Sequence, residues 1–311
     1  MRTFITLDIG GTNTRCALFD EGSIKPIKQA KITTSIDGQP AIERLIKIIS
    51  EIWPDDNSVA GICAGAPGSI NVNEGVVILA PNIPGWKNFE LGKILSEKFK
   101  VPVFINNDAR MAAIGEWKYG AGIGHDNLMY FTISTGLGNG TISHGRLLEG
   151  SIGIATESGH VVIDENGPLC GCGKKGHLEA YSSGTGIENF VRDEIGKGVN
   201  STLSSLQNPG AWQIAEAARK GDALAKKAFE RAGYYLGIGI SNYLHIFNPS
   251  CVIFGGGVSQ SGDLLMLPFR KSLESHVLNI NYLSNLEIKL ASLGDDVGII
   301  GAMAYLKDKL G

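Results

Sequence analysis

Two glycine-rich turns, each lying between strand-like apolar runs, constrain the fold of this chain more than any other feature. The first joins residues 4–7 to residues 15–19 through a glycine pair, and the second joins residues 128–133 to residues 141–142 through residues 136–140. Short strands joined by such turns are typical of a β-meander. Because the second meander repeats the first, the sequence indicates a diverged duplication and two α/β lobes.

Length and composition also favour a two-lobed globular protein. The chain has 311 residues, and single hydrophobic cores stop growing at about 250 to 300 residues. Glycine accounts for 42 residues, about twice its usual share of roughly 7%. The 28 basic and 31 acidic residues nearly cancel to a net charge of −3, which argues against nucleic acid and membrane surfaces as partners.

The start of the chain and its cysteines indicate a cellular compartment. No basic segment followed by an apolar run precedes the first strand, so we expect neither a signal peptide nor a membrane span. We therefore expect a cytoplasmic protein. The five cysteines are an odd number, and in a reducing compartment they are better explained as thiols or metal ligands than as disulfides.

Between and after the two meanders, the pattern alternates strands with helices. Apolar residues recur at helical spacing over residues 41–53, and a buried strand follows at residues 59–63. Another helix follows Asn107-Asp108 and runs to residue 119. The other expected elements are strands at 24–32, 101–105 and 251–254 and helices at 91–99, 178–195, 222–247 and 297–310.

The first glycine turn has the chemistry of a polyphosphate cradle. It joins two strands, so it cannot be the strand-to-helix loop of the P-loop enzymes. Without Cβ atoms, its backbone N–H groups can approach phosphate oxygens, and a carboxylate at the strand end can hold a hydrated Mg²⁺. An ordinary glycine hairpin is the alternative at this point. The residues concerned are Asp8, Gly10, Gly11, Thr12 and Asn13.

Two further glycine clusters extend this hypothesis. The second turn begins with the hydroxyl pair Ser134-Thr135, so two turns can hold one nucleotide from opposite lobes. The third cluster follows a buried strand, where bare backbone can let an adenine and ribose lie flat; taken alone, it is better explained as a simple strand-to-helix turn. The nucleotide-binding residues expected in these clusters are Thr135, Gly136, Gly138, Gly255, Gly256 and Gly257.

Seven short motifs follow one another along the chain: Asp8-Ile9-Gly10-Gly11-Thr12, Ala66-Pro67-Gly68, Asn107-Asp108-Ala109, Ser134-Thr135-Gly136-Leu137-Gly138, Glu157-Ser158-Gly159-His160, Cys170-Gly171-Cys172-Gly173 and Gly255-Gly256-Gly257. In this order they resemble the ROK (repressor/ORF/kinase) family throughout its length. The resemblance implies the α/β, two-lobed, actin-like and ribonuclease-H-like ATPase fold of the hexokinase–actin superfamily. Residues 1–118, completed by the last helix at 297–311, would form the small lobe. Residues 119–296 would form the larger lobe, with a zinc loop.

The resemblance further implies that Asp108 is the catalytic base. The matching aspartate of the family faces the accepting hydroxyl, where a carboxylate can take its proton. In isolation, Asn-Asp before a helix also looks like an N-cap. Arg110 stands where the family often has a small or amide residue, which can reshape the edge of the sugar pocket. By resemblance, the sugar-binding residues are Gly65, Asn82, Asn107, Asp108, Glu157, His160 and Glu179.

A structural zinc site is also implied. The family usually supplies one histidine and three cysteines, and here His177 stands where the third cysteine is expected. The ligands would be His160, Cys170, Cys172 and His177, a Cys₂His₂ set of the kind that binds zinc tetrahedrally. A lost metal site is the alternative.

The implied activity is the phosphorylation of a hexose at its 6-hydroxyl by MgATP. The segment Ala80 to Trp86 is similar to a stretch of the family's glucokinases, which favours glucose over fructose. The alternatives are a fructokinase, an N-acetylglucosamine or N-acetylmannosamine kinase, and a non-catalytic sugar-sensing regulator. Regulators of the family carry a winged helix-turn-helix module before the first glycine turn, and only seven residues precede Asp8 here. A donor other than ATP, including polyphosphate, stays open, and the family implies a homodimer or homotetramer.

Overall fold

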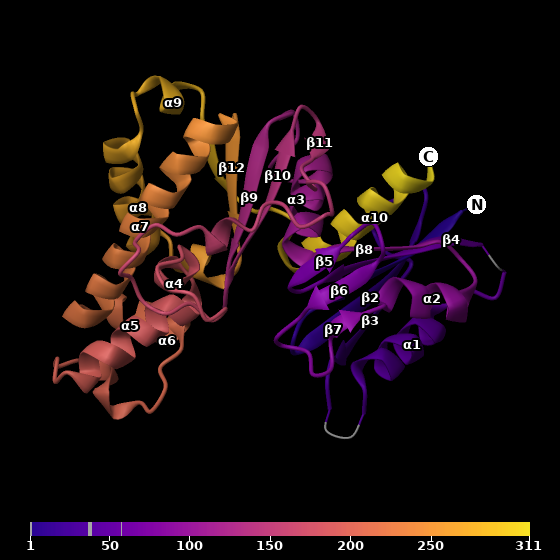
Figure 1. Ribbon diagram of the computed structural model, residues 1–311, viewed down its shortest axis with the longest axis horizontal. Coiled ribbons are helices and arrows are strands. Elements are labelled where there is room, and N and C mark those ends of the chain that lie inside the picture. The colour runs from indigo at the N-terminus through magenta and orange to yellow at the C-terminus, as the bar shows by residue number, and fades with distance from the viewer. Residues whose placement is uncertain (1, 37–38, 57) are drawn as a thin grey trace. The chain divides into compact units, whose positions relative to one another are not determined.

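The computed structural model describes residues 2–36, 39–56 and 58–311 (Figure 1). Its internal contacts divide the chain into two compact units. The first comprises Met1–His125, Gly140–Thr156 and Ala291–Gly311, and the second comprises Asp126–Asn139 and Glu157–Leu290. The sequence-based division placed residues 119–125, 140–156 and 291–296 in the second lobe, whereas their contacts group them with the first unit.

The first unit is built on a five-stranded mixed sheet. The central strand β1 is parallel to β4 and antiparallel to β2, so the N-terminal meander forms one side of the sheet and βαβ units form the other. Both β1 and β4 are buried almost throughout, as expected for strands covered on both faces. In spatial order the strands are β3 (Lys28–Thr33), β2 (Asn13–Asp20), β1 (Thr3–Ile9), β4 (Val59–Ala66) and β8 (Val103–Asn107).

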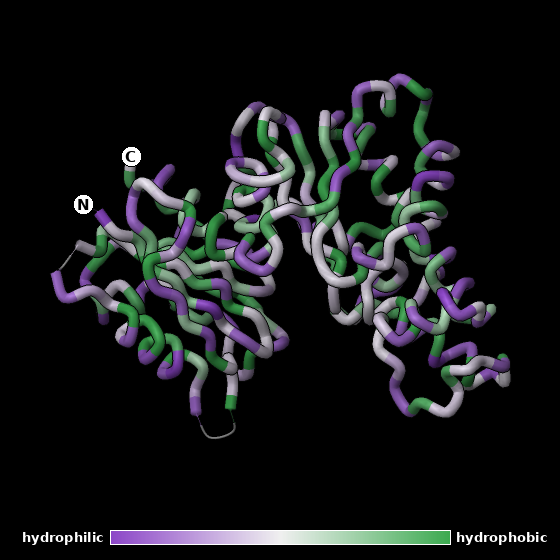
Figure 2. Tube along the Cα trace, turned by 180° about the vertical axis from the view of Figure 1, so that it is seen from behind, coloured by the Kyte–Doolittle hydropathy of each residue, from purple (hydrophilic) through white to green (hydrophobic). Residues whose placement is uncertain are grey.

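Helices cover this sheet because each has an apolar face. In α1 (Ala41–Ile52), the buried residues Leu45, Ile48, Ile49 and Ile52 recur at helical spacing and pack into one core with β1, β2 and β4; hydrophilic and hydrophobic residues mix along this helix in Figure 2. Each such side chain contributes roughly 1.5 to 3 kcal/mol by leaving water. The other elements are α2 (Leu91–Phe99), α3 (Asp108–Tyr119), α10 (Val297–Leu310) and the small sheet β5 (Ser69–Asn71), β6 (Val76–Leu79) and β7 (Lys87–Phe89).

The helices α3 and α10 approach each other through glycines. A Cβ on Gly115 of α3 would lie 2.7 Å from the carbonyl oxygen of Val297, and a Cβ on Gly301 of α10 would collide with the carbonyl oxygen of Met111. The other side of α10 packs against β2 through Ile299, Ile300 and Met303. This contact holds the C-terminal helix on the N-terminal sheet.

The second sheet has the same order as the first. Its strands β9 and β12 are parallel, as are β12 and β13, while β10 and β11 form an antiparallel hairpin. The predicted duplication is therefore visible in the topology. In spatial order the strands are β11 (Arg146–Leu147), β10 (Leu137–Ser143), β9 (Leu128–Ile133), β12 (Cys251–Gly255) and β13 (Glu287–Leu290).

The second unit is organised around the long helix α7. This helix begins after its N-cap Asp222, whose side chain accepts from the Ala225 N–H at 2.9 Å, and its buried residues lie in the core of the unit. It packs against α4, α5, α6 and α8. The helices are α4 (Glu179–Ser182), α5 (Gly184–Gly196), α6 (Ala211–Arg219), α7 (Ala223–Phe247), α8 (Asp263–His276) and α9 (Asn281–Ser284), with short 3₁₀ turns at Ser158–His160, Thr202–Ser205 and Gly257–Ser261.

Two sequence-based expectations in this unit were wrong. The second glycine turn is confined to Ser134–Gly136, and Gly138 to Gly140 lie in β10. The missing side chain of Gly140 leaves room for α3, because its Cβ would lie 3.0 Å from the Cα of Arg110. The expected helix over 178–195 is broken at Ser183, which is extended and accepts from the Gly186 N–H as the N-cap of α5.

The expected third strand also begins later than the sequence suggested, at Lys28 rather than Ile24. Pro26 has no N–H to give to the ladder, so pairing can start only beyond it. Among the described residues, no helix combines the length and the apolar composition needed to cross a membrane.

Substituting Gly301 by alanine tests the close packing of α3 and α10. The new methyl group would meet the Met111 carbonyl, and such overpacking typically costs about 1 to 3 kcal/mol. We expect urea denaturation to show a loss of that size for Gly301→Ala. The matched control is Gly196→Ala at the end of α5, where a Cβ has no neighbour within 4 Å. Equal stability of the two variants would contradict this account.

Candidate active site

The first glycine turn connects β1 and β2 tightly. The Gly10 N–H donates to the Asn13 carbonyl at 2.9 Å, and the Thr34 hydroxyl donates to the Gly10 carbonyl at 2.6 Å. No side chain fits at Gly11, because a Cβ there would lie 2.8 Å from the Cβ of Asn82. The structure therefore brings a predicted nucleotide turn into contact with a predicted sugar residue.

Asp8 lies near the end of β1, beside the first turn of α10. A Cβ on Gly298 would lie 2.6 Å from the Asp8 carboxyl carbon. Burial raises the pKa of the Asp8 carboxyl, Arg15 lowers it, and Asp295 raises it. Arg15 is itself paired with Asp295, with Nη2 and Oδ2 at 2.5 Å. Since a nearby cation favours the charged form of a buried carboxyl, the environment of Asp8 fits the predicted role beside Mg²⁺.

Asn107 and Asp108 stand at the junction of β8 and α3, where their roles separate. The Asn107 side chain is the N-cap of α3 and accepts from the N–H groups of Ala109 at 3.0 Å and Arg110 at 3.3 Å. Asp108 is the first residue of the helix, half-buried, and its Oδ1 accepts from the Ala109 N–H at 2.8 Å. Gly65 lies beside it, since its Cβ would be 3.5 Å from the Asp108 Cα. Capping therefore rests on Asn107.

A chain of contacts joins this junction to the first glycine turn. The Asn107 amide donates to the Gly68 carbonyl at 3.1 Å. Gly68, with a φ of +86°, lies so close to β6 that a Cβ on it would collide with the carbonyl oxygen of Leu79, the last residue of that strand. Three residues further, Asn82 contacts Gly11. The predicted sugar and nucleotide residues of the first unit are thus one connected group.

The second glycine turn is bound by both α4 and α5. The Gly184 N–H, at the start of α5, donates to the Ser134 carbonyl at 2.7 Å. From α4, Glu179 Oε2 accepts the Leu137 N–H at 2.9 Å, and a Cβ on Gly136 would lie 2.6 Å from the same oxygen. As in the first unit, a predicted sugar-binding side chain lies directly against a predicted nucleotide turn.

The third glycine cluster packs on the same turn. Gly256 has a φ of +84°, and a Cβ on it would collide with the carbonyl of Ile133, the last residue of β9. The Thr135 carbonyl accepts from the Thr185 N–H at 3.3 Å. The predicted nucleotide residues of the second unit therefore meet at one end of its sheet, although Gly138 lies in β10 rather than in the turn.

The motif from Glu157 to His160 is anchored on β10. Residues Ser158–His160 form a 3₁₀ turn. The Ser158 hydroxyl donates to Asn139 Oδ1 at 3.0 Å, and the Tyr243 hydroxyl of α7 donates to the Ser158 carbonyl. Glu157, on one side of the turn, is exposed, and His160, on the other side, is half-buried and directed toward the cysteines.

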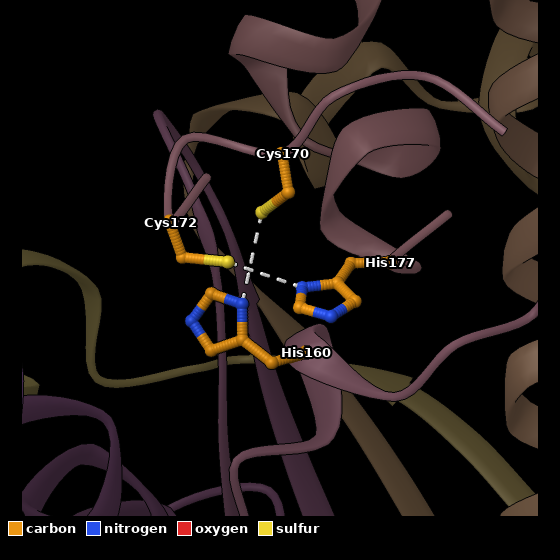
Figure 3. Close-up of side chains that lie close together, drawn as sticks. All are labelled: His160, Cys170, Cys172 and His177. Carbon is orange, nitrogen blue, oxygen red and sulfur yellow. Dashed lines mark hydrogen bonds between the residues drawn. The ribbon is translucent and has the colours of Figure 1, made fainter. Parts of the chain in front are cut away.

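Four side chains gather their ligand atoms in one place (Figure 3). His160 Nδ1 lies 3.7 Å from Cys170 Sγ, Cys172 Sγ lies 3.3 Å from His177 Nδ1, and all four ligand atoms lie within 4.8 Å of one another. Ligands 2.0 to 2.3 Å from a tetrahedral zinc are separated by roughly 3.3 to 3.8 Å. The predicted Cys₂His₂ set therefore has a suitable geometry for zinc.

Burial is the main influence on the pKa values of Cys170 and His177 in this cluster. Burial, opposed by a backbone hydrogen bond near Cys172 and reinforced by Glu179, raises the pKa of the Cys170 thiol to about 12. Burial and the neighbouring His160 lower the pKa of His177, which favours the neutral imidazole that binds metals. The Cys170 thiol donates to Glu179 Oε1 at 3.2 Å. One carboxylate thus contacts both the cysteine loop and the second glycine turn.

Sequence reasoning missed several residues of this arrangement. Thr34, directly after β3, closes the first turn through its hydroxyl, and no local pattern in the sequence indicates this contact. Because Gly298 of α10 has no Cβ, the Asp8 carboxyl can lie against this helix. The position of this glycine early in an apolar helix could have indicated the contact. The contacts of Arg110 with the loop before Glu157 depend on long-range packing and leave no local signal.

The duplicated sheets define the class of the protein. In each sheet an antiparallel three-stranded meander is followed by two parallel strands, and a glycine turn joins the first two strands of each meander. This is the two-lobed, actin-like and ribonuclease-H-like α/β fold of the hexokinase–actin superfamily.

Comparison with known proteins identifies the family. The ROK family model matches residues 4–309. A glucokinase of Thermotoga maritima is 36% identical over 99% of this chain and 98% of its own length. A ROK family glucokinase from Streptomyces griseus, solved with glucose and AMPPNP, is 30% identical with a TM-score of 0.81 over 97% of this chain and 98% of that one. A xylose repressor of Bacillus subtilis is 34% identical over 86% of this chain and 66% of its own length. The chain belongs to the ROK family, and that prediction is confirmed.

Proposed function

We propose that the chain is an ATP-dependent glucokinase, which transfers the γ-phosphoryl group of ATP to the 6-hydroxyl of glucose. One observation carries the proposal. In each unit a predicted nucleotide turn lies directly against a predicted sugar-binding side chain, Gly11 against Asn82 and Gly136 against Glu179. Direct transfer between two bound substrates requires such adjacency. The full-length likeness to glucokinases supports the same substrates.

In the proposed reaction, the protein positions glucose and ATP for direct transfer and accepts one proton. The sugar oxygen forms a bond to the γ-phosphorus while the bond from phosphorus to the β,γ-bridging oxygen breaks, and ADP leaves. Asp108 takes the proton of the attacking hydroxyl. Asn107 provides the N-cap of α3, so the Asp108 carboxylate is not required for capping. Backbone N–H groups of the glycine turns stabilise the charge on the transferring phosphoryl group.

Asp8 is proposed to hold, through water, the Mg²⁺ that accompanies ATP. The ion, when bound, neutralises charge on the phosphate oxygens. The buried position of Asp8, which raises its pKa, is one where a cation would restore the charged carboxylate. Thr12 and Asn13 are exposed on the adjacent turn and can donate to the same phosphates.

Glucose is proposed over other hexoses because of Asn82. It lies in a segment similar to that of glucokinases, and it lies beside Gly11 of the first glycine turn. Glu179 uses one oxygen for Leu137 and the other for Cys170, and a carboxylate with roughly four acceptor positions keeps capacity for sugar hydroxyls. Fructose and the N-acetylated hexosamines remain the alternative substrates.

A non-catalytic, sugar-responsive regulator is the second candidate function. The likeness to the Bacillus subtilis xylose repressor favours it. The presence of Asp108 together with all three glycine clusters supports catalysis instead. An activity assay separates the two candidates, because a regulator would bind sugar without releasing ADP.

A panel of sugars and phosphate donors in a coupled assay of ADP release tests the substrate. We expect glucose with ATP to give the highest kcat/KM, ahead of fructose, N-acetylglucosamine and N-acetylmannosamine. Glucose 6-phosphate should form in equal amount to ADP. A higher kcat/KM for any other sugar would overturn the choice of glucose, and sugar binding with no turnover would favour the regulator.

Replacing Asp108 by asparagine tests its role as the base. We expect kcat to fall by about a hundredfold or more, the usual contribution of a general base, while glucose binding measured by calorimetry changes little. Asp263→Asn is the matched control, since Asp263 is the first residue of α8 as Asp108 is of α3. Turnover in Asp108→Asn equal to that of the control would remove Asp108 from this role.

We further propose a structural zinc ion held by His160, Cys170, Cys172 and His177. The separations of their ligand atoms support it. The ion would keep both thiols deprotonated despite the raised pKa of Cys170. The Cys170 thiolate would then have no proton to donate to Glu179, which would leave that carboxylate oxygen to accept from a sugar hydroxyl.

Metal analysis of protein purified without added zinc tests this site. We expect about one zinc per chain, and a large loss of zinc together with a lower Tm in Cys172→Ala. Cys251→Ala is the control, because Cys251 is a buried cysteine of β12 outside the cluster. Clearly substoichiometric zinc in the unaltered protein would argue for a lost site, and zinc retained in Cys172→Ala would remove Cys172 from the ligand set.

Two expectations from the resemblance stay predictions. One is assembly as a homodimer or homotetramer. The other is a cytoplasmic location.

A further inference from the structure

Arg110 is the largest fully buried side chain among the described residues, with 1% of its surface exposed. It lies on α3, two residues after Asp108. Its guanidinium donates to the carbonyl oxygens of Gly153 and Ala155, and lies 3.4 Å from the Thr156 hydroxyl. A buried guanidinium with several fixed acceptors holds those acceptors rigidly, because losing the donor would leave them unsatisfied.

The loop that Arg110 holds has a strained backbone. Thr156 has a φ of +67°, a conformation that β-branched residues rarely adopt and that persists only where surrounding contacts enforce it. Gly153, with a φ of +81°, lies so close to Val72 that a Cβ would be 2.6 Å from the Val72 Cβ. Contacts on both sides therefore hold the loop, and Glu157 is the residue that follows it directly.

The same guanidinium reaches the end of β8. Its Nη1 lies 3.4 Å from Asn106 Oδ1, which accepts from the Asn107 N–H at 2.8 Å. Asn106 in turn donates to Glu149, at the start of the loop, at 3.0 Å. One side chain thus connects the strand end before Asp108 with the loop before Glu157.

We propose that Arg110 is a positioning residue for sugar binding: it holds Thr156 in its strained conformation and so fixes the backbone from which Glu157 extends. The inference rests on the proposed function, since Glu157 is there a sugar ligand. The acceptors that Arg110 holds lie in the loop before Glu157 and at the end of β8, so it acts through Glu157 on the affinity for the sugar.

Arg110→Met, which keeps the length of the side chain and removes its donors, tests the proposal. We expect KM for glucose to rise about tenfold, with KM for ATP within about twofold and kcat within about threefold, because displacing a binding group by about 1 Å has effects of this order. Ile48→Ala, a cavity on α1 in the core of the same unit, is the control for lost stability. It should lower Tm and leave KM for glucose unchanged. An unchanged KM in Arg110→Met, or equal rises in both variants, would overturn the proposal.

Two additions keep the test decisive. If Arg110→Met does not fold, Arg110→Lys keeps the charge without the fork of donors, and an unchanged KM for glucose in that variant contradicts the proposal. Hydrogen exchange of the ligand-free protein needs no activity. The amides of residues 153–157 should exchange at least about tenfold faster in the Arg110 variant than in the unaltered protein, as expected for a segment that opens locally. If exchange is faster in the variant but the unaltered protein does not turn over glucose, Arg110 does hold the loop and the proposed glucokinase function is wrong. If exchange is unchanged, only the proposed role of Arg110 is wrong.

Discussion

In both units, the backbone of a glycine lies so close to a polar side chain that the glycine could not carry a Cβ. Gly11 meets Asn82 in this way in the first unit, and Gly136 meets Glu179 in the second. A methyl group at either glycine would push the side chain away from the turn. The absence of a side chain at each glycine therefore decides where the predicted sugar-binding side chain can lie. In each unit, the predicted nucleotide turn and the predicted sugar-binding side chain share one steric requirement.

Glu179 extends this dependence to the cysteine loop. One of its oxygens accepts from the backbone beside the second glycine turn, and the other accepts from Cys170. His160 belongs to both the proposed zinc set and the sugar motif, and its 3₁₀ turn is held by Tyr243 and Asn139. The metal loop, the sugar motif and the phosphate turn of the second unit therefore form one continuous set of contacts.

Local signals predicted most of the elements. The apolar periodicity of residues 41–53 was read correctly, and the Asn107-Asp108 pair correctly marked the start of α3, because helical spacing and caps depend on neighbouring residues. The second turn was read as too long, since glycines needed for a turn and glycines needed for helix packing look alike in sequence. Gly140 belongs to the second kind, against α3. The break at Ser183 was missed because the helical pattern continues across it, while the cap that interrupts it is visible only in the structure.

The sequence by itself determined the family, the duplicated α/β plan, the glycine turns and the four metal-ligand candidates, because these are carried by residue types at short, fixed spacings. Only the tertiary structure decided which of these residues touch. It separated Asn107 as the cap from Asp108 as the first helical residue, set Asn82 and Glu179 against their turns, and buried Arg110 under the loop before Glu157. Such contacts join residues tens of positions apart. They depend on how strands and helices pack, which cannot be predicted from secondary-structure propensity or from the spacing of residues in a motif.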